Sequence, residues 1–322
     1  MNTSIDFTVA ICTYNGEKRV PEVLERLQNQ VDIQNLRWEV IVVDNNSTDN
    51  TSQMIQEYQA KWSPHNPLIY CWESQQGAAF ARKRAIRESR AELIGFLDDD
   101  NIPALNWVAA AYAFAQEHPQ AGAYASQNHP DFEVTPPDNF HRIAPFLAIT
   151  ERGSQALLYQ PQSKLLPPSA GLVVRKQAWL ESIPEKPILT GRTKGSMLTS
   201  EDLEVLSYIQ QSDWEIWYNP AMELHHKIPS WRLTKDYLIP FFRGIGLSRH
   251  VTRTIGIKSW LIPVAVVAYM TNDLRKFLLH LLKYQAKVKT DLVAACEMQL
   301  ILSSLISPIY IYWWKNRSRK QN

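Results

Sequence analysis

Three adjacent carboxylates close a short apolar run in the stretch IGFLDDDNIP, residues 94–103. Asp98, Asp99 and Asp100 repel one another, so their crowding needs a counter-charge or free access to water. Carboxylate oxygens are the ligands that Mg²⁺ and Mn²⁺ prefer, and such ions often join a protein to a phosphate through one or two carboxylates. The spacing of Asp98 and Asp100 suits this arrangement, although a solvated acidic turn would show the same pattern.

A second acidic group lies in TSEDLEV, residues 199–205. Glu201 and Asp202 follow Ser200, which is a good helix cap, and acids in a first helical turn are favoured by the helix dipole. A carboxylate in this position could also serve as a general base. The residues alone leave both interpretations open.

The elements that must position these acids are predicted from the first hundred residues, where short β-rich runs alternate with helical patterns. Strands with hardly any polar alternation indicate a parallel sheet covered on both faces, in which ligands bind beyond the carboxyl ends of the strands. Thr13, Asn15 and Asp44 lie at such ends, together with the three aspartates. The predicted strands cover residues 7–13, 38–44, 68–73 and 91–98, and the predicted helices cover 21–30, 47–59 and 77–89.

The middle of the chain continues this mixed pattern. We expect a helix at 105–118, a strand at 121–126, a strand entering a helix at 169–180, and a helix followed by one or two strands across 200–226.

The character changes from about Pro229. Residues 260–270 are largely apolar but too few to span a bilayer, which needs roughly 20 residues. Residues 273–291 predict an amphipathic helix, and 298–314 form a weakly polar run before the basic end KNRSRKQN. We expect peripheral or monotopic attachment to a membrane surface. A single span and an ordinary helical subdomain are the alternatives.

Composition limits the classes of function. The 322 residues are 45% hydrophobic, which suffices for a substantial core, and the formal net charge of +2 gives no argument for nucleic-acid binding. Cys12, Cys71 and Cys296 lie far apart, which indicates neither a disulfide framework nor a zinc site. The N-terminus shows no basic segment followed by an apolar one, so we expect the protein in the cytoplasm or on a membrane surface facing it.

Five segments together resemble glycosyltransferase family 2, the inverting GT-A enzymes that use nucleotide-diphosphate sugars. They are VAICTYNG, EVIVVDNNSTDNT, QQGAAFARKRAI, FLDDDN and SEDLEV, and the resemblance covers roughly residues 6–228. It implies an α/β GT-A fold with a Rossmann-like mixed sheet in a domain of residues 1–228, followed by a helical, membrane-associating region of residues 229–322. SAGLVVRK and FFRGIGLSRH look like the hormogonium polysaccharide branch of the family.

The resemblance implies a role for each matching residue on the donor side. Asp44 would accept a hydrogen bond from the nucleobase, commonly uracil, while Thr13 and Asn15 would contact the nucleoside. Gly77 would permit close approach of the backbone, and Arg82 would lie on the nucleotide. The sequence departs from the family pattern at Gln75, Lys83 and Ala85, which puts the exact base contacts in doubt.

It also implies a divalent cation, Mg²⁺ or Mn²⁺. Asp98 would face the ribose and metal-bound water, Asp100 would ligate the metal, and Asp99 would join the donor site. Of the late histidines, His225 is favoured over His226 as the group that approaches the metal or diphosphate. Asp202 would be the catalytic base, and Glu201 and Gly171 would lie on the acceptor side.

The predicted function is transfer of a sugar, with inversion, from a nucleotide-diphosphate donor, expected to be a UDP-sugar, to a hydroxyl of a glycan or lipid-linked acceptor. The setting would be polysaccharide biosynthesis at the cytoplasmic face of the plasma membrane. The alternatives are a polyprenyl-phosphate glycosyltransferase, whose anionic acceptor needs no base, a sugar-nucleotide pyrophosphorylase, and a non-catalytic scaffold. The pyrophosphorylase would carry a Gly-rich, Arg-containing loop after the first strand, where TYNGEKR stands instead.

Overall fold

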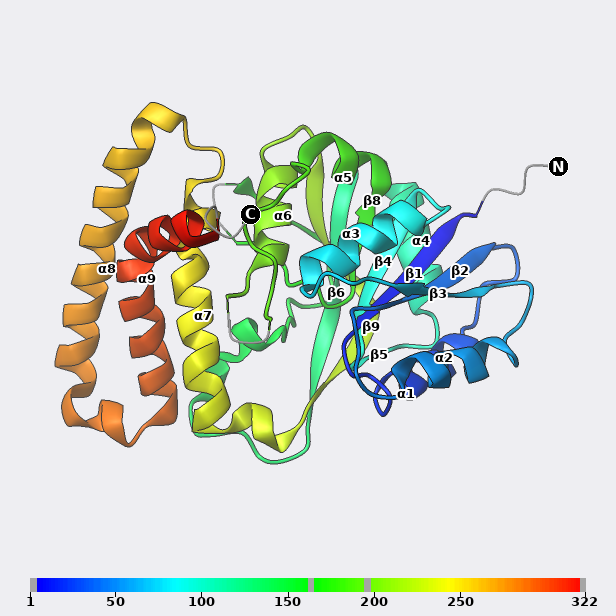
Figure 1. Ribbon diagram of the computed structural model, residues 1–322, viewed down its shortest axis with the longest axis horizontal. Coiled ribbons are helices and arrows are strands. Elements are labelled where there is room, and N and C mark those ends of the chain that lie inside the picture. Colours follow the sequence, from blue (N-terminus) through cyan, green and yellow to red (C-terminus); the bar gives the residue numbers. More distant parts are fainter. Residues whose placement is uncertain (1–4, 162–164, 194–197, 319–322) are drawn as a thin grey trace. The chain divides into compact units, whose positions relative to one another are not determined.

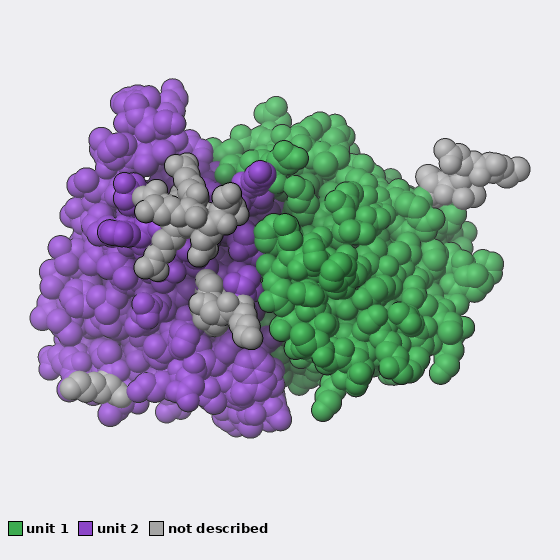
Figure 2. Space-filling view, in the orientation of Figure 1, with its two compact units in different colours: residues 1–131, 148–185, 208–228 green, residues 132–147, 186–207, 229–322 purple. Residues whose placement is uncertain are grey.

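The computed structural model describes residues 5–161, 165–193 and 198–318. The chain forms two compact units, coloured separately in Figure 2. The first unit contains residues 1–131, 148–185 and 208–228, and the second contains 132–147, 186–207 and 229–322. One boundary coincides with the predicted change at residue 229, but residues 132–147 and 186–207 group with the C-terminal region.

The first unit is built on a mixed sheet, as predicted, with strands in the order β3-β2-β1-β4-β8-β6-β9-β5 and β7 paired to β9 (Figure 1). The four strands β3, β2, β1 and β4 are parallel, and β8 runs antiparallel to β4. The strands among the described residues are β1 (Phe7–Thr13), β2 (Trp38–Asp44), β3 (Leu68–Trp72), β4 (Leu93–Asp98), β5 (Asn101–Pro103), β6 (Ala121–Phe132), β7 (Leu157–Leu158), β8 (Leu172–Arg175) and β9 (Glu215–Ile228).

Helices connect the parallel strands, because such strands need a long crossover. Val23, Leu24 and Leu27 recur at helical spacing on α1 and are fully buried. α3 packs against β1 and β2, and α4 packs against β1, β4 and β9. The helices of this unit are α1 (Val20–Gln28), α2 (Thr51–Gln59), α3 (Ala78–Glu88), α4 (Trp107–Glu117) and α5 (Lys176–Ser182).

Two strands differ from the expectation. β6 continues to Phe132, beyond the predicted end at residue 126. β9 is one strand of 14 residues, which settles the choice between one and two strands. Burial alternates along its C-terminal half, so neighbouring side chains there face opposite sides of the sheet.

The second unit is mainly helical, with α6 (Glu201–Gln210) beginning in it and α7 (Lys235–Thr254), α8 (Ile262–Tyr284) and α9 (Leu292–Ser318) following. The amphipathic helix predicted at 273–291 differs at both ends, because no breaker separates it from the apolar run before it and α8 ends at Tyr284. Short 3-10 helices lie at Phe140–Arg142, Ala144–Leu147, Ser230–Leu233, Ser259–Leu261 and Gln285–Lys289.

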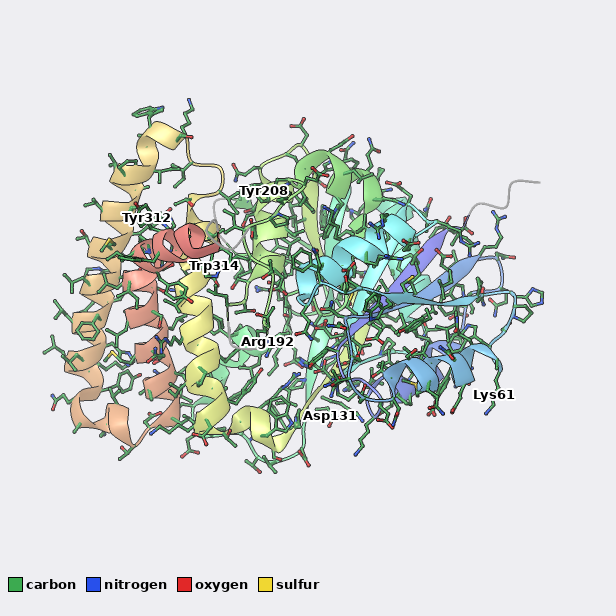
Figure 3. The ribbon with its side chains drawn as sticks, in the orientation of Figure 1. Lys61, Asp131, Arg192, Tyr208, Tyr312 and Trp314 are labelled. Carbon is green, nitrogen blue, oxygen red and sulfur yellow. The ribbon has the colours of Figure 1, made fainter. Side chains whose placement is uncertain are left out.

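A small apolar cluster of the second unit joins Leu189 to Val251 of α7 and Ile311 of α9. Nearby, Arg192, labelled in Figure 3, donates a hydrogen bond of 2.6 Å to the Tyr237 hydroxyl of α7. These contacts attach the segment before α6 to the helices of the same unit.

Within the described ranges, one helix is long and apolar enough to cross a membrane, the stretch Leu292–Trp314 of α9. Its most apolar window has a mean hydropathy of 1.7 and is 44% buried inside the protein. Helices in the core of soluble proteins can show the same properties. The basic end of the chain lies partly outside the described residues, at 319–322.

A buried carboxylate on β2 connects this strand to β1 and to the loop between α3 and β4. Glu39 is fully buried, accepts a hydrogen bond of 2.9 Å from the Thr8 hydroxyl of β1, and is bound by the Arg90 backbone N–H at 3.0 Å and its Nε at 2.7 Å. Removing one partner of such a pair leaves a buried polar group unsatisfied, which costs more than the pair contributes net.

We therefore expect Glu39→Ala to lower the free energy of unfolding by about 3 kcal/mol, measured by urea denaturation. The control is Arg37→Ala on the same edge, whose ion pair with Asp6 is 3.9 Å long and half-exposed. This control should cost less than about 1 kcal/mol. Equal losses in the two variants would contradict the role given to Glu39.

Candidate active site

The middle carboxylate of the acidic cluster is neutralised by a cation from the loop after β1. Asp99 is buried, and its two oxygens accept hydrogen bonds of 2.9 Å from Nε and Nη2 of Arg19. The Thr13 hydroxyl donates a further bond of 2.5 Å to Oδ2. Desolvation raises the pKa of Asp99, and the bond from Arg19 opposes this shift. The crowding of acids at residues 98–100 therefore has its counter-charge within the protein.

Arg19 was missed in the sequence analysis. Its only signal was a cation one helical turn after the loop TYNG, and nothing in the sequence identified an acid about 80 residues away as its partner. Thr13, predicted to contact the nucleoside, binds Asp99 in the structure.

Asn101 holds the turn between β4 and β5. Its Oδ1 accepts a hydrogen bond of 3.0 Å from the backbone N–H of Asp98, and its Nδ2 donates one of 3.1 Å to Oδ1 of Asp100. The side chain is fully buried. Asn101 therefore holds the main chain at Asp98 and orients the carboxylate of Asp100, a role that the sequence analysis did not assign.

Arg82 of α3 faces Asp98 inside the first unit. Its Nη2 atom lies 3.7 Å from Oδ1 of Asp98 and donates a hydrogen bond of 2.8 Å to the Ser169 hydroxyl. Desolvation raises the pKa of Asp98 to about 6, Arg82 opposes the shift and Asp100 adds to it. The Asp98 side chain is nevertheless 40% exposed, so it can reach a ligand.

His226, rather than His225, lies beside Asp100. Its Nε2 is 3.6 Å from Oδ1 of Asp100, and both side chains are buried. The register of β9 against β5 decides this, because His226 pairs with Asn101 and His225 with Ile102. The His225 side chain is exposed and its ring lies 5.5 Å from that of His129. The geometry does not favour His225, the residue preferred from spacing alone.

Asp44, predicted to read the nucleobase, ends β2 in a buried position. Its Oδ1 accepts a hydrogen bond of 2.9 Å from the Ser47 backbone N–H, and Oδ2 accepts one of 2.9 Å from the Tyr70 hydroxyl. Each carboxylate oxygen can accept two hydrogen bonds, so one site on each remains for a ligand. Tyr70 orients the carboxylate and was not recognised from the sequence.

Asn15 and Gly77 lie in loops that are held by side-chain hydrogen bonds. Asn15 Oδ1 accepts a bond of 2.8 Å from the Thr48 backbone N–H. The Gly77 N–H donates one of 2.8 Å to Oδ1 of Asn45, whose Nδ2 in turn binds the Gln75 carbonyl at 2.6 Å. Asn45 therefore organises the loop before α3, where the predicted close backbone approach would occur.

Gly171 precedes β8 in a position that excludes a side chain. Its φ is +68°, and a Cβ there would lie 2.3 Å from Cδ2 of Leu224 and 2.4 Å from Oγ of Ser126. The Gly171 carbonyl accepts a hydrogen bond of 2.7 Å from Ser126, whose hydroxyl also accepts one of 2.9 Å from Trp107 Nε1. The predicted acceptor-side residue thus rests on a buried network of the same unit.

Glu201 and Asp202 open helix α6, as predicted, after Ser200 with a φ of +74°. They belong to the second unit and not, as was expected, to a unit of residues 1–228. Glu201 is buried and Asp202 is partly exposed. Glu204 is fully buried and accepts hydrogen bonds of 2.8 and 2.6 Å from the backbone N–H groups of Ile188 and Leu189. The role of Asp202 as base stays a prediction.

A divalent cation fits the donor chemistry of the first unit. Asp98 and Asp100 supply oxygens and His226 an imidazole, whereas Asp99 is already bound to Arg19. In the part of the chain that is described, no three His, Cys, Asp or Glu side chains are grouped closely enough to hold an ion by themselves. This donor set suits an ion that is shared with a substrate phosphate.

Comparisons with known proteins agree with this architecture. The family model described as Glycosyl transferase family 2 matches residues 8–174. Poly(ribitol-phosphate) beta-N-acetylglucosaminyltransferase TarS of Staphylococcus aureus is 34% identical over 113 residues, which cover 35% of this chain and 19% of TarS. The chain therefore matches about a fifth of that relative's length.

Two solved structures show the same fold over most of the chain. The crystal structure of S. aureus TarS 1-349 in complex with UDP-GlcNAc has a TM-score of 0.54 at 16% identity and covers 95% of this chain and 91% of that one. Mannosyltransferase PcManGT from Pyrobaculum calidifontis, in complex with GDP-Man and Mn²⁺, has a TM-score of 0.59 at 17% identity, with coverage of 98% and 89%. The GT-A fold is confirmed.

Arg19→Ala should leave Asp99 buried with Thr13 as its remaining side-chain donor. We expect the free energy of unfolding to fall by about 2 kcal/mol, measured by urea denaturation. The control is Arg87→Ala on α3, whose exposed guanidinium pairs with the adjacent Glu88; it should change stability by less than about 0.5 kcal/mol. A loss no larger than that of the control would remove Arg19 from the organisation of the acidic cluster.

The neighbouring histidines provide a matched pair for the metal site. His226→Ala should weaken Mn²⁺-dependent binding of UDP about tenfold or more, as loss of a metal-site neighbour usually does. His225→Ala should leave this binding nearly unchanged, since its side chain is exposed and faces His129. Titration calorimetry with and without Mn²⁺ measures UDP binding by the two variants. A larger loss in His225→Ala than in His226→Ala would assign the metal-site role to His225.

Proposed function

We propose, from the fact that this chain belongs to Glycosyl transferase family 2 and from the geometry around Asp98 and Asp100, that it transfers a sugar from a nucleotide-diphosphate donor to a hydroxyl of a glycan or lipid-linked acceptor. The observation that carries the proposal is the arrangement of these two acids. Asp99 is neutralised internally, which leaves Asp98 beside Arg82, and Asp100, bound by Asn101, beside His226. This is a suitable place for a diphosphate with its cation.

The donor is a UDP-sugar in this proposal. Asp44 keeps acceptor capacity beyond its bonds to Ser47 and Tyr70, and the imide N–H of uracil is a donor that a carboxylate can bind. The complex of TarS with UDP-GlcNAc supports a nucleotide sugar as partner, and PcManGT, which is in complex with GDP-Man, leaves other bases to be tested.

The cation is Mg²⁺ or Mn²⁺, held by Asp98 and Asp100 with His226 alongside. When bound, it would neutralise the charge that develops on the leaving nucleoside diphosphate. Arg82 lowers the pKa of Asp98 against the effect of burial and so favours its ionised form, and Asn101 binds Asp100. The Mn²⁺ in the PcManGT complex supports this choice of cofactor.

Transfer with inversion proceeds in one displacement. The acceptor oxygen forms a bond to the anomeric carbon as the bond from that carbon to the diphosphate breaks, and the hydroxyl proton passes to Asp202. Glu201 and Gly171 lie on the acceptor side in this scheme, and Glu204 maintains the first turn of α6 by binding the chain at Ile188 and Leu189.

The setting is polysaccharide biosynthesis at the cytoplasmic face of the plasma membrane. The similarity to TarS, a poly(ribitol-phosphate) beta-N-acetylglucosaminyltransferase, supports a cell-surface polymer as the class of acceptor. Membership of the family argues against a sugar-nucleotide pyrophosphorylase. A polyprenyl-phosphate acceptor would make the base unnecessary. Turnover of the Asp202→Asn variant therefore distinguishes such an acceptor from a hydroxyl acceptor. Assignment to the hormogonium polysaccharide branch stays a prediction.

The proposal is tested first at the donor. Asp100→Asn should abolish Mn²⁺-dependent binding of a UDP-sugar in a calorimetric screen of nucleotide sugars, because it removes the charge that attracts the cation. Asp213→Asn, at an exposed acid between α6 and β9, is the control and should bind like the unmodified protein. Cation-dependent binding that survives in Asp100→Asn would defeat the assignment.

The base is tested separately. Asp202→Asn should lower turnover by about 10²–10⁴-fold while donor affinity stays nearly the same. Turnover is measured as release of the nucleoside diphosphate in the presence of pooled glycan and lipid-linked acceptors. If Asp202→Asn retains full turnover, a hydroxyl acceptor activated by this residue is ruled out and an anionic acceptor becomes the better explanation.

A further inference from the structure

Helix α8 buries polar side chains and exposes apolar ones. Its buried residues are Asp273 and His280, both polar. Its large apolar side chains are exposed along the opposite side, at Val264, Val267, Leu274, Leu278, Leu279, Leu281 and Leu282. An amphipathic helix on a water-soluble core shows the reverse arrangement, with the apolar stripe inward.

The buried polar groups of α8 are satisfied inside the second unit. Asp273 accepts hydrogen bonds of 2.6 and 3.1 Å from the two Nη atoms of Arg253 on α7. His280 Nε2 lies 2.9 Å from the carbonyl oxygen of Ala294 on α9. These contacts fix which side of α8 faces its neighbours, so the apolar side is left outward.

Helix α9 also exposes large apolar side chains, although it buries Met298, Leu300 and Ile311 as well as polar residues. Ser303, Ser304 and Ser307 are buried, and the Ser307 hydroxyl accepts a hydrogen bond of 2.9 Å from the His250 N–H of α7. The helices approach closely there, since a Cβ on Gly246 of α7 would lie 2.5 Å from Cβ of Ser303. The outward residues of α9 are Leu302, Ile306, Ile309, Tyr312 and Trp313.

Figure 1 shows α8 and α9 side by side, and Figure 3 labels Tyr312 and Trp314 in the last turns of α9. Small and polar residues between helices, with large apolar residues outside, are the arrangement that suits a lipid environment. In water, each exposed leucine forgoes part of the free energy that burial of its side chain would contribute. Contiguous exposed apolar surface of this kind marks a docking site.

Cationic and aromatic side chains at the borders of this surface indicate that it binds lipid. Lys258 and the largely exposed Trp260 lie before α8, and Lys283 and Lys287 are exposed at its other end. Aromatic and cationic residues in such positions fit the boundary between acyl chains and anionic headgroups. The acids nearby are committed to partners, Asp273 to Arg253 and Glu297 to Arg142.

We infer that the outward faces of α8 and α9 dock into the surface layer of an anionic lipid bilayer without crossing it. Arg275 and Lys276 are exposed in the middle of α8, and a charge carried to the bilayer centre is costly. A helix lying in the interface lets both side chains reach the headgroups. The inference rests on the polarity of these helices and is independent of the proposed reaction.

Flotation of the full chain with vesicles of phosphatidylglycerol and phosphatidylcholine tests the inference. The double variant Leu278→Gln/Leu282→Gln should bind these vesicles about tenfold more weakly or worse, since two apolar anchors are lost. The matched control is Leu180→Gln on α5, because Leu180 is 66% exposed, comparable with 50% for Leu278 and 71% for Leu282. It should bind like the unmodified protein, and circular dichroism checks that all variants are folded.

The cationic border is tested with Lys283→Gln/Lys287→Gln. This variant should bind anionic vesicles more weakly, by about fivefold for each charge at low salt, and should bind phosphatidylcholine vesicles like the unmodified protein. Absence of vesicle binding by the unmodified chain overturns the inference, as does equal binding by the leucine variant. A dimer that dissociates on Leu278→Gln/Leu282→Gln would assign the surface to a second copy of the chain instead.

Discussion

The ion pair between Arg19 and Asp99 is the interaction on which the polar edge of the first unit depends. Three consecutive carboxylates at the end of β4 would otherwise repel one another in a partly desolvated place. Arg19 neutralises one of these charges, and the bonds that Arg19 and Thr13 each donate to Asp99 fasten the end of β1 and the loop after it to the turn after β4. Asp98 and Asp100 can then remain close together and available for a ligand, whereas Asp99 between them is bound to Arg19.

Much of this edge could be predicted, because strand ends are encoded locally. Apolar runs without polar alternation placed Thr13, Asp44 and Asp98 at the carboxyl ends of parallel strands, and the sheet brings those ends together. The partners of each side chain could not be predicted. Tyr70, Arg82 and Ser169 meet their partners through the sheet order and not through proximity in the chain.

The C-terminal region shows a different limit of sequence reasoning. An amphipathic pattern reveals that a helix has two faces, but the pattern is the same whether the apolar or the polar face is inward. Only the contacts of Asp273 with Arg253, and of His280 with Ala294, decide the orientation of α8. The apolar run and the amphipathic pattern that follows it belong to one helix, since a change from apolar to amphipathic composition does not interrupt a helix.

The pairing of β9 with β5 constrains how this protein can change over evolutionary time. Neighbouring residues on a strand face opposite sides, so inserting one residue in β9 upstream of His225 would bring His225 beside Asp100 in place of His226, and deleting one would bring Lys227 there. A two-residue change would keep a side chain of the same face beside Asp100. Length variation is therefore tolerable in the loop between α6 and β9, whereas within the strand only changes by an even number of residues keep the same face beside Asp100.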